Sequence, residues 1–436
     1  MKRMAIKRRF DLRLGFAVPV LLLFVAASPG VRAEAGERHG LQLQELLAEA
    51  ALNNPEILGA RNEREAAQHR VSPAGALDDP MLEAGVVNAP LASQTFRRED
   101  MTMKMLGLSQ RFPFPGKRGL REDVAAKDAE SVSHAYQETV NRVARDVKAA
   151  YFELAFVVES ARLVEKNKQV LEQFLQISES RYTVGQGSQA DVLKAQTQLT
   201  GMVDELIKLA RERRTIEAEL AFALGRETDA GMPAPATLPL LETALQFESL
   251  RDTALTERSQ LLGLKSLIER SEKALELARK DYYPDFDVKL AYGQRENMLD
   301  GTRRDDMLSL TVAVNLPVWR ASKRDPGVAE AIAMRNQATN MYQAQLNEVS
   351  SQLRQQVAKA EQSLKSARLY ESGILPGARL AVESSLAAYR VNRVDFLTLL
   401  DSQMTVLNYE ISYASALSNY NIALAEIELL TGETQF

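Results

Sequence analysis

The stretch RYTVGQGSQADVLKAQTQL, residues 181–199, is a short glycine-rich break between two long segments that have the composition of helix. Gly185 tolerates the left-handed backbone conformation with which many helices end. Ser188 and Asp191 form the Ser-x-x-acid pattern with which a helix begins. The stretch therefore predicts the tip of a helical hairpin, where one long helix ends and a second one starts and runs back.

A second stretch, YRVNRVDFLTLLDSQMTVL at residues 389–407, repeats this pattern. Asn392 stands where the first stretch has Gly185, and Asp395 stands where it has Ser188. Asn enters the left-handed conformation more readily than most residues, and Asp is a common helix N-cap. The chain is therefore expected to contain two hairpin tips of the same design.

Other landmarks recur at nearly the same distance along the chain. The separation is 204 residues from Pro80 to Pro284 and from Pro113 to Pro317. Five later pairs are separated by 207 residues: Tyr182 and Tyr389, Val184 and Val391, Leu193 and Leu400, Gln196 and Gln403, Gly225 and Gly432. So steady an offset predicts that the chain is a tandem duplication.

The two repeats are predicted at residues 41–232 and 245–433, joined by a Pro-rich linker at 233–244. Each has the order helix, two strands, long helix, break and return helix. Neither Gly nor Pro occurs from Leu120 to Val184, whereas Pro376 is expected to kink or divide the long helix of the second repeat. Apolar residues recur every seven positions in the second return helix, which predicts core packing by coiled-coil contacts. They are Leu399, Val406, Tyr413, Tyr420 and Ile427.

Two segments in each repeat alternate apolar and polar residues, as strands with two different faces do. They lie at residues 80–88, 101–112, 285–293 and 305–319. Their length and alternation match the wall of a membrane barrel. Because roughly eight strands are the minimum for a barrel, four cannot close one. Three chains with twelve strands are expected to do so. The predicted fold class is mainly α, with long coiled-coil helical hairpins and a four-stranded antiparallel membrane sheet.

The first 33 residues have the order of a secretory signal: basic residues, an apolar stretch from Leu14 to Ala27, and a small-residue site. Cleavage after Ala33 is expected, and it changes the formal net charge from −4 to about −10. So acidic a chain argues against nucleic acid as a partner. Cysteine is absent, which excludes disulfides and a lipid-modified N-terminal cysteine. No later apolar run is long enough for a transmembrane helix, so any membrane insertion is expected through strands.

Several motifs resemble the TolC-like outer-membrane efflux protein family. They are ALNNPEI, the DP before the first strand pair, the two tip stretches and YYPDF. The segment GLSQRFPFPGKRGLR is most similar to the heavy-metal efflux branch. The resemblance implies a homotrimer with a barrel in the outer membrane, a periplasmic helical α-barrel and a closed aperture. It also implies three further partners and no cofactor: a periplasmic adaptor (membrane fusion) protein, an inner-membrane resistance-nodulation-division pump and outer-membrane lipid.

The same resemblance implies roles for residues at the tips. The residues expected to contact the adaptor are Val184, Gly185, Gln186, Ser188, Val391, Asn392 and Arg393. Asn392 departs from the family's usual Gly. Asp401, and after it Asp395 and Asp191, are candidates for the aperture, where a ring of three carboxylates favours cations. The alternatives are that Asp191 and Asp395 start helices and that Asp401 is a solvated surface charge.

Three other groups have a functional and a structural interpretation. Met101, Met103 and Met105 alternate along a predicted strand and offer thioethers to a soft cation such as Cu(I), or they pack within the sheet. The histidines lack the spacing of metal ligands and are expected at the surface: His39, His69 and His134. Four basic residues contact lipid headgroups or form a solvated helix start: Arg111, Lys117, Arg118 and Arg121.

No catalytic motif is present, so an enzyme is not expected. The first hypothesis is a passive exit duct for solutes, with heavy-metal cations as the expected cargo. Two alternatives stay open at this stage. One is the outer-membrane channel of type I protein secretion. The other is a periplasmic coiled-coil adaptor, although adaptors usually carry one hairpin between β-rich halves.

Overall fold

The computed structural model describes most of the chain beyond the predicted signal peptide. The described residues are 43–91, 95–227 and 245–433, with Met232, Pro235 and Thr243. The predicted signal peptide at residues 1–33, its cleavage site after Ala33, and His39 lie outside these residues. Most of the predicted linker at 233–244 lies outside them too. The described residues belong to a compact unit that extends from Gly40 to Phe436.

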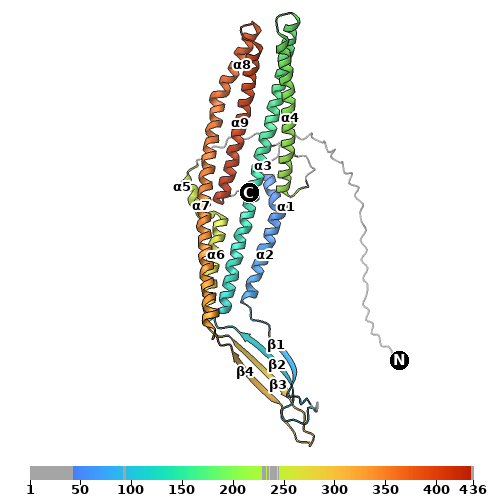
Figure 1. Cartoon of the computed structure of the whole chain (residues 1–436), viewed down its shortest axis with the longest axis vertical. Coiled ribbons are helices and arrows are strands. Elements are labelled where there is room, and N and C mark those ends of the chain that lie inside the picture. Colours follow the sequence, from blue (N-terminus) through green and yellow to red (C-terminus); the bar gives the residue numbers. More distant parts are fainter. Residues whose placement is uncertain are drawn as a thin grey trace, which may run out of the picture. The chain divides into compact units, whose positions relative to one another are not determined.

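Two sets of elements follow one another in the same order. The first set is α1 (Leu43–Asn53), α2 (Pro55–Gly75), β1 (Met81–Val87), β2 (Met103–Phe112), α3 (Lys117–Thr183) and α4 (Gln189–Leu224). The second set is α5 (Phe247–Glu257), α6 (Ser259–Lys280), β3 (Phe286–Gln294), β4 (Met307–Val314), η1 (Arg320–Arg324), α7 (Asp325–Leu369), η2 (Tyr370–Ile374), α8 (Leu375–Arg390) and α9 (Phe396–Thr431). Figure 1 shows the strands at one end of the helices and both hairpin tips at the other. This is the order that a duplication requires, and the duplication itself stays a prediction.

The long helices form where the sequence lacks breakers. α3 is continuous for 67 residues, which at 1.5 Å per residue is about 100 Å. The second long helix is interrupted by η2, a single π turn that ends two residues before Pro376. Proline lacks an N–H group, and its ring clashes with the carbonyl of the residue four positions earlier. The predicted interruption at Pro376 is therefore confirmed.

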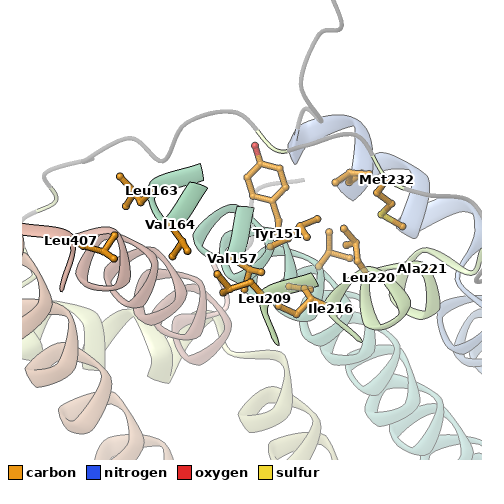
Figure 2. Packing of buried hydrophobic residues seen from close by; sticks show 14 of the residues in the cluster. Tyr151, Val157, Leu163, Val164, Leu209, Ile216, Leu220, Ala221, Met232 and Leu407 are labelled. Carbon is orange, nitrogen blue, oxygen red and sulfur yellow. The ribbon is translucent and has the colours of Figure 1, made fainter. Parts of the chain in front are cut away.

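The core lies mainly along α3, which packs against α2, α4, α6 and α9. Figure 2 shows Val157 of α3 and Leu209 of α4 within one apolar cluster, with Leu407 of α9 nearby. Burying one such leucine contributes about 2 kcal/mol. The heptad stripe of α9 is buried as predicted, with Leu399 and Tyr420 fully enclosed and Tyr413 partly so.

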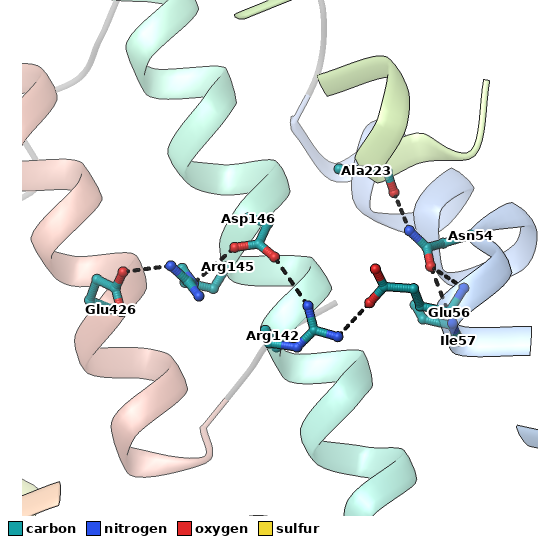
Figure 3. A network of polar contacts seen from close by, with 8 residues as sticks. All are labelled: Asn54, Glu56, Ile57, Arg142, Arg145, Asp146, Ala223 and Glu426. Atoms are coloured by element: carbon teal, nitrogen blue, oxygen red, sulfur yellow. Dashed lines mark hydrogen bonds and ion pairs between the residues drawn. The ribbon is translucent and has the colours of Figure 1, made fainter. Parts of the chain in front are cut away.

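Each return helix ends against a break between two short helices of its own half. At the first break, Asn54 donates a hydrogen bond from Nδ2 to the Ala223 carbonyl at 2.8 Å, and its Oδ1 accepts from the amide of Ile57 (Figure 3). Gly225 then takes a positive φ of 71°. A Cβ there would lie 2.6 Å from the Asn53 carbonyl oxygen, so this close approach requires glycine.

A guanidinium group occupies the corresponding position of the second break. Arg258 donates to the Leu429 carbonyl at 2.9 Å and to Oε1 of Glu138 at 3.1 Å. Burial raises the pKa of Glu138 and lowers the pKa of Arg258, so desolvation outweighs their mutual attraction. Gly432 has φ of 85°, and a Cβ there would lie 2.6 Å from the Glu257 carbonyl oxygen.

Candidate functional site

The four strands form one antiparallel sheet in the order β1-β2-β3-β4, and one of its faces is apolar. The register places Leu82 beside Leu108, Leu108 beside Leu290, and Leu290 beside Leu310. This row of leucines is 71%, 51%, 48% and 71% exposed. The other apolar side chains of this face are Ala84, Val86, Leu106, Phe112, Phe286, Val288, Tyr292, Leu308, Val312 and Val314. Lys104 and Gln110, near the ends of β2, are polar exceptions.

The opposite face carries mostly polar or small side chains, because successive residues of a strand point to opposite sides. Its larger apolar side chains are Met81, Val87, Met103, Met105 and Met307. Lys289 forms an ion pair with Glu83 across β2, over Gly107. Ser109 and Thr311 flank Lys289 on the two neighbouring strands. The predicted alternation of apolar and polar faces is therefore confirmed.

The sheet is incomplete in two respects. No helix of the described residues lies along either of its faces (Figure 1). One edge of β1 and one edge of β4 have no neighbouring strand within the described residues. An exposed apolar face of this size marks a contact surface for a membrane or another protein. The free strand edges pair readily with other chains.

One of the three methionines, Met101, is placed differently from the prediction. Met101 precedes β2, in a turn closed by a hydrogen bond of 3.2 Å from the Thr102 amide to the Glu99 carbonyl, so it does not continue the alternation. Met103 and Met105 lie on the polar face. The Met103 sulfur fills the space above Gly293, where a Cβ would lie 2.5 Å from it. Packing therefore accounts for Met103.

Conventional metal ligands do not converge in the described part of the chain, where no group of three or more His, Cys, Asp or Glu side chains is arranged to hold a metal ion. His69 is exposed and lies 3.9 Å from Glu65. His134 is half-buried and lies under Gly263.

Three of the four basic residues at the first strand-to-helix junction contact other groups of the chain. Lys117 is only 3% exposed and donates from Nζ to Oδ1 of Asp285 at 2.9 Å and to the Tyr283 carbonyl at 3.1 Å. Arg111 lies 3.5 Å from the same aspartate, on the polar face. Neither a headgroup contact nor a solvated helix start therefore applies to Lys117, because the residues that follow α6 supply acceptors at the start of α3. Arg118 likewise donates to the Gly75 carbonyl at 2.8 Å, and Arg121 is exposed.

The first hairpin tip has the predicted geometry. Gly185 has φ of 73°. Ser188 accepts from the Asp191 amide at 3.2 Å, while Asp191 accepts from the Ser188 amide at 3.3 Å, which together form a capping box. Val184 beside the turn is 67% exposed.

The second tip has the same backbone geometry and a helix cap of the same kind, formed by different residues. Asn392 has φ of 60°, and Asp395 accepts a hydrogen bond of 3.0 Å from the Thr398 amide. The hydrogen bonds from the Thr398 hydroxyl and amide hold the pKa of Asp395 below its ordinary value. Asp191 and Asp395 therefore both start helices, and Val391 is 63% exposed.

The two tips contact each other, which the sequence did not predict. Arg181 donates from its guanidinium to the Tyr389 carbonyl at 2.6 Å and lies 4.6 Å from the centre of the Tyr389 ring. The only local signal for this contact is that an arginine, Arg181, directly precedes the tyrosine of the first tip.

Asp401 lies in the second turn of α9 and is exposed, and its carboxylate makes no hydrogen bond or ion pair with any described residue.

Comparisons with known proteins agree with this arrangement. Residues 46–226 match the family model of outer membrane efflux proteins. The chain is 22% identical over 402 residues to the cobalt-zinc-cadmium resistance protein CzcC of Cupriavidus metallidurans, covering 90% of both chains. It is 23% identical over 430 residues to the outer membrane protein TolC of Vibrio cholerae, covering 95% of both.

Solved structures share the fold. One is the outer membrane protein VceC of Vibrio cholerae, with a TM-score of 0.75 at 18% identity, over 90% of this chain and 96% of that one. Another is CusC, with a TM-score of 0.77 at 14% identity, over 92% and 95%. Among the described residues, no helix is both long and apolar enough to cross a membrane. The matched segment, the full-length relatives and the shared fold confirm the resemblance to the TolC-like outer membrane efflux protein family that the sequence motifs indicate.

Proposed function

We propose that the protein is the outer-membrane channel subunit of a tripartite efflux system. It is a passive exit duct that receives solute from an inner-membrane pump and a periplasmic adaptor. The observation that carries the proposal is the two-faced sheet, whose leucine row is exposed while its opposite face holds the ion pair of Glu83 and Lys289. In a barrel wall the first face contacts lipid and the second lines an aqueous lumen.

The free edges of β1 and β4 determine the assembly. Unpaired strand edges are not tolerated in lipid, because each unsatisfied backbone group there costs several kcal/mol. Three copies close the wall with twelve strands, a number within the range of known barrels. The helices of the three copies then continue as a periplasmic α-barrel, and the duct exists only in the trimer.

The hairpin tips face away from the membrane end and are the proposed docking site of the adaptor. Val184 and Val391 are exposed beside the two turns, and Gln186, Ser188 and Arg393 offer polar contacts around them. Three exposed Asp401 side chains, one from each copy, form the proposed ring at the aperture. A carboxylate ring favours cations. Asp191 and Asp395 contribute charge there in addition to starting their helices.

Heavy-metal cations are the proposed cargo. The support is the full-length relative described as a cobalt-zinc-cadmium resistance protein, together with the acidic aperture. The proposal assigns no catalysis, and it does not require resident metal ligands in the duct, because a passive channel transports without tight binding.

A matched pair of substitutions tests the channel. Leu310→Arg places a charge on the apolar face, which costs about 2–4 kcal/mol near the membrane midplane. Thr311→Arg places the same charge on the neighbouring residue of the opposite face. We expect the first variant to lose trimers and single-channel current in planar bilayers, and the second to keep both. Equal behaviour of the two variants, or a wild-type protein that stays monomeric and gives no current, would refute the proposal.

The cargo is tested in a deletion strain. Loss of the gene is expected to lower resistance to cobalt, zinc or cadmium, and the wild-type gene restores it. Asp401→Asn is expected to reduce cation preference in bilayers, whereas Asp252→Asn, an exposed carboxylate in α5, leaves it unchanged. Unchanged metal resistance together with lost polypeptide export would replace the metal assignment by protein secretion.

A further inference from the structure

The apolar face continues beyond the last strand. β4 ends at Val314, yet Leu316 and Val318 keep the even-numbered alternation of Leu308 to Val314, and they are 72% and 67% exposed. Trp319 follows and is 72% exposed. The apolar surface therefore extends past the sheet to the start of the helices.

Three cations follow this apolar segment within one π turn. Arg320, Lys323 and Arg324 belong to η1, and within the described part of the chain none of their side chains makes a hydrogen bond or an ion pair. The adjacent carboxylate, Asp325, accepts a hydrogen bond from the Tyr282 hydroxyl, which ties the start of α7 to the end of α6. The segment from Leu316 to Arg324 thus presents an apolar part and a charged part side by side.

The first strand-to-helix junction has no such surface among its described residues. There Lys117 is buried against Asp285, and Phe114 stacks on Tyr283 with ring centres 4.5 Å apart. Arg118 donates to the Gly75 carbonyl. The chain itself supplies partners to Lys117 and Arg118 at the first junction, whereas the described residues supply none to the side chains of the three cations of the second.

An anionic lipid surface fits the second junction. Tryptophan prefers the boundary between acyl chains and headgroups, where its ring is buried and its N–H stays hydrated. Guanidinium groups bind phosphate oxygens in pairs of hydrogen bonds. Each cation close to an anionic bilayer strengthens attachment about fivefold. The apolar side chains follow directly on the strand whose apolar face the barrel turns toward lipid, and the cations come just after them, where the helices begin.

We propose that residues 316–324 form an interfacial anchor that binds anionic phospholipid headgroups at the membrane edge nearest the helices. Trp319 lies at the acyl boundary, and Arg320, Lys323 and Arg324 contact the phosphates. This anchor rests on the proposed outer-membrane function. It lies on the lipid side of the wall and takes no part in conduction.

Trp319 makes the test direct, because it is the single tryptophan of the chain. The mature protein is reconstituted in vesicles of phosphatidylethanolamine and phosphatidylglycerol. In each preparation one of the two lipids carries bromine on its acyl chains, close to the headgroup. We expect brominated phosphatidylglycerol to quench the fluorescence of Trp319 several-fold more than its share of the lipid predicts. The triple substitution Arg320→Gln, Lys323→Gln, Arg324→Gln is expected to abolish this preference. The control triple removes three cations of α3 and α7 that, like those of the anchor, are exposed or half-buried: Lys166→Gln, Arg335→Gln and Lys359→Gln.

A second probe separates the anchor from the channel. In a Trp319→Phe background, Leu310→Trp places the only tryptophan in the leucine row. Quenching of this probe with no quenching of Trp319 in the wild-type protein means that a neighbouring copy covers Trp319, which overturns the anchor and leaves the channel intact. Equal quenching of Trp319 by both brominated lipids also overturns it. If neither tryptophan is quenched, the sheet is not in lipid, and the proposed function fails as well.

Discussion

The two halves of the chain follow one plan but satisfy their polar groups differently. At the break that receives the return helix, the first half uses a neutral amide, Asn54, and the second half uses a charged guanidinium, Arg258. Both donate to a carbonyl near the end of the return helix. The neutral amide of Asn54 needs only hydrogen bonds. The buried guanidinium of Arg258 is also paired with the carboxylate of Glu138, which balances its charge. The same position in a fold can therefore be filled at very different electrostatic cost.

At the strand-to-helix junctions it is the first half, not the second, that buries a charged side chain. The first junction buries its cation, Lys117, against two carboxylates that follow α6, whereas the second leaves Arg320 and Trp319 exposed. The first half therefore uses a neutral side chain at its break and a buried charged side chain at its strand-to-helix junction. At these two levels each half buries one cation and the carboxylate partner comes from the other half, so the two halves are expected to respond unequally to matched substitutions.

The largest difference is expected at the two breaks. Arg258→Ala leaves Glu138 partly buried without its cation and should lower the free energy of unfolding by about 3–5 kcal/mol. Asn54→Ala removes a cap and a neutral hydrogen bond and should lower it by about 1–2 kcal/mol. Circular dichroism during unfolding in detergent, at one protein concentration, measures both. Equal losses would show that the charge difference has no energetic consequence.

The glycines that end the return helices give the next largest effect. Gly225→Ala and Gly432→Ala each combine a positive φ with a close backbone contact, so each should cost about 2 kcal/mol. The cost should be greater at Gly432, where a Cβ would also lie 2.9 Å from the Arg258 Cα. The control, Gly201→Ala in the interior of α4, has open space and should stabilise by about 0.5–1 kcal/mol. The ordering of the three melting curves tests this assignment.

The hairpin tips are expected to differ less. A Cβ at Gly185 would have no atom within 4 Å, but the residue has a positive φ, so Gly185→Ala should cost about 1 kcal/mol through backbone strain alone. Asn392→Gly places the more tolerant residue in the same conformation and should change stability by less than about 0.5 kcal/mol. Thermal unfolding of the two variants measures both changes. A larger loss at Asn392 than at Gly185 would mean that the asparagine side chain holds the second tip.

The smallest effect is a pH dependence confined to the first half. Burial, and then repulsion from Glu219 and Glu212, raises the pKa of Glu153. The fold therefore favours the protonated form, a contribution that is present below the unfolded pKa of about 4.3 and lost as pH rises through the folded value. Glu153→Gln should stabilise the protein at neutral pH by less than about 1 kcal/mol, because solvent screens this exposed group. Denaturant titrations should show the gain disappearing near pH 4, and a gain that persists there would contradict the electrostatic cause.

Local patterns predict the helices, tips and strands well, because each depends on neighbours in sequence. The run from Leu120 to Val184, the Ser188 cap and the alternation of β4 all carry their own signal. The side chains of Arg181, Arg258 and Lys117 meet partners more than 100 residues away, and no local pattern specifies such contacts. Met101 departs from its predicted strand for a different reason, because a local turn closed by Glu99 and Thr102 decides where β2 starts.

The π turn at residues 370–374 gives the two hairpins different mechanical properties. α3 has an unbroken ladder of hydrogen bonds along 67 residues and resists bending everywhere alike. The outer arm of the second hairpin is interrupted, and helices bend where the ladder is interrupted. Flexing of that hairpin should therefore concentrate at a hinge, with the 16 residues of α8 as a short lever that carries the second tip. A continuous α3 beside an interrupted second hairpin should therefore allow the second tip to move while the long helices keep their length.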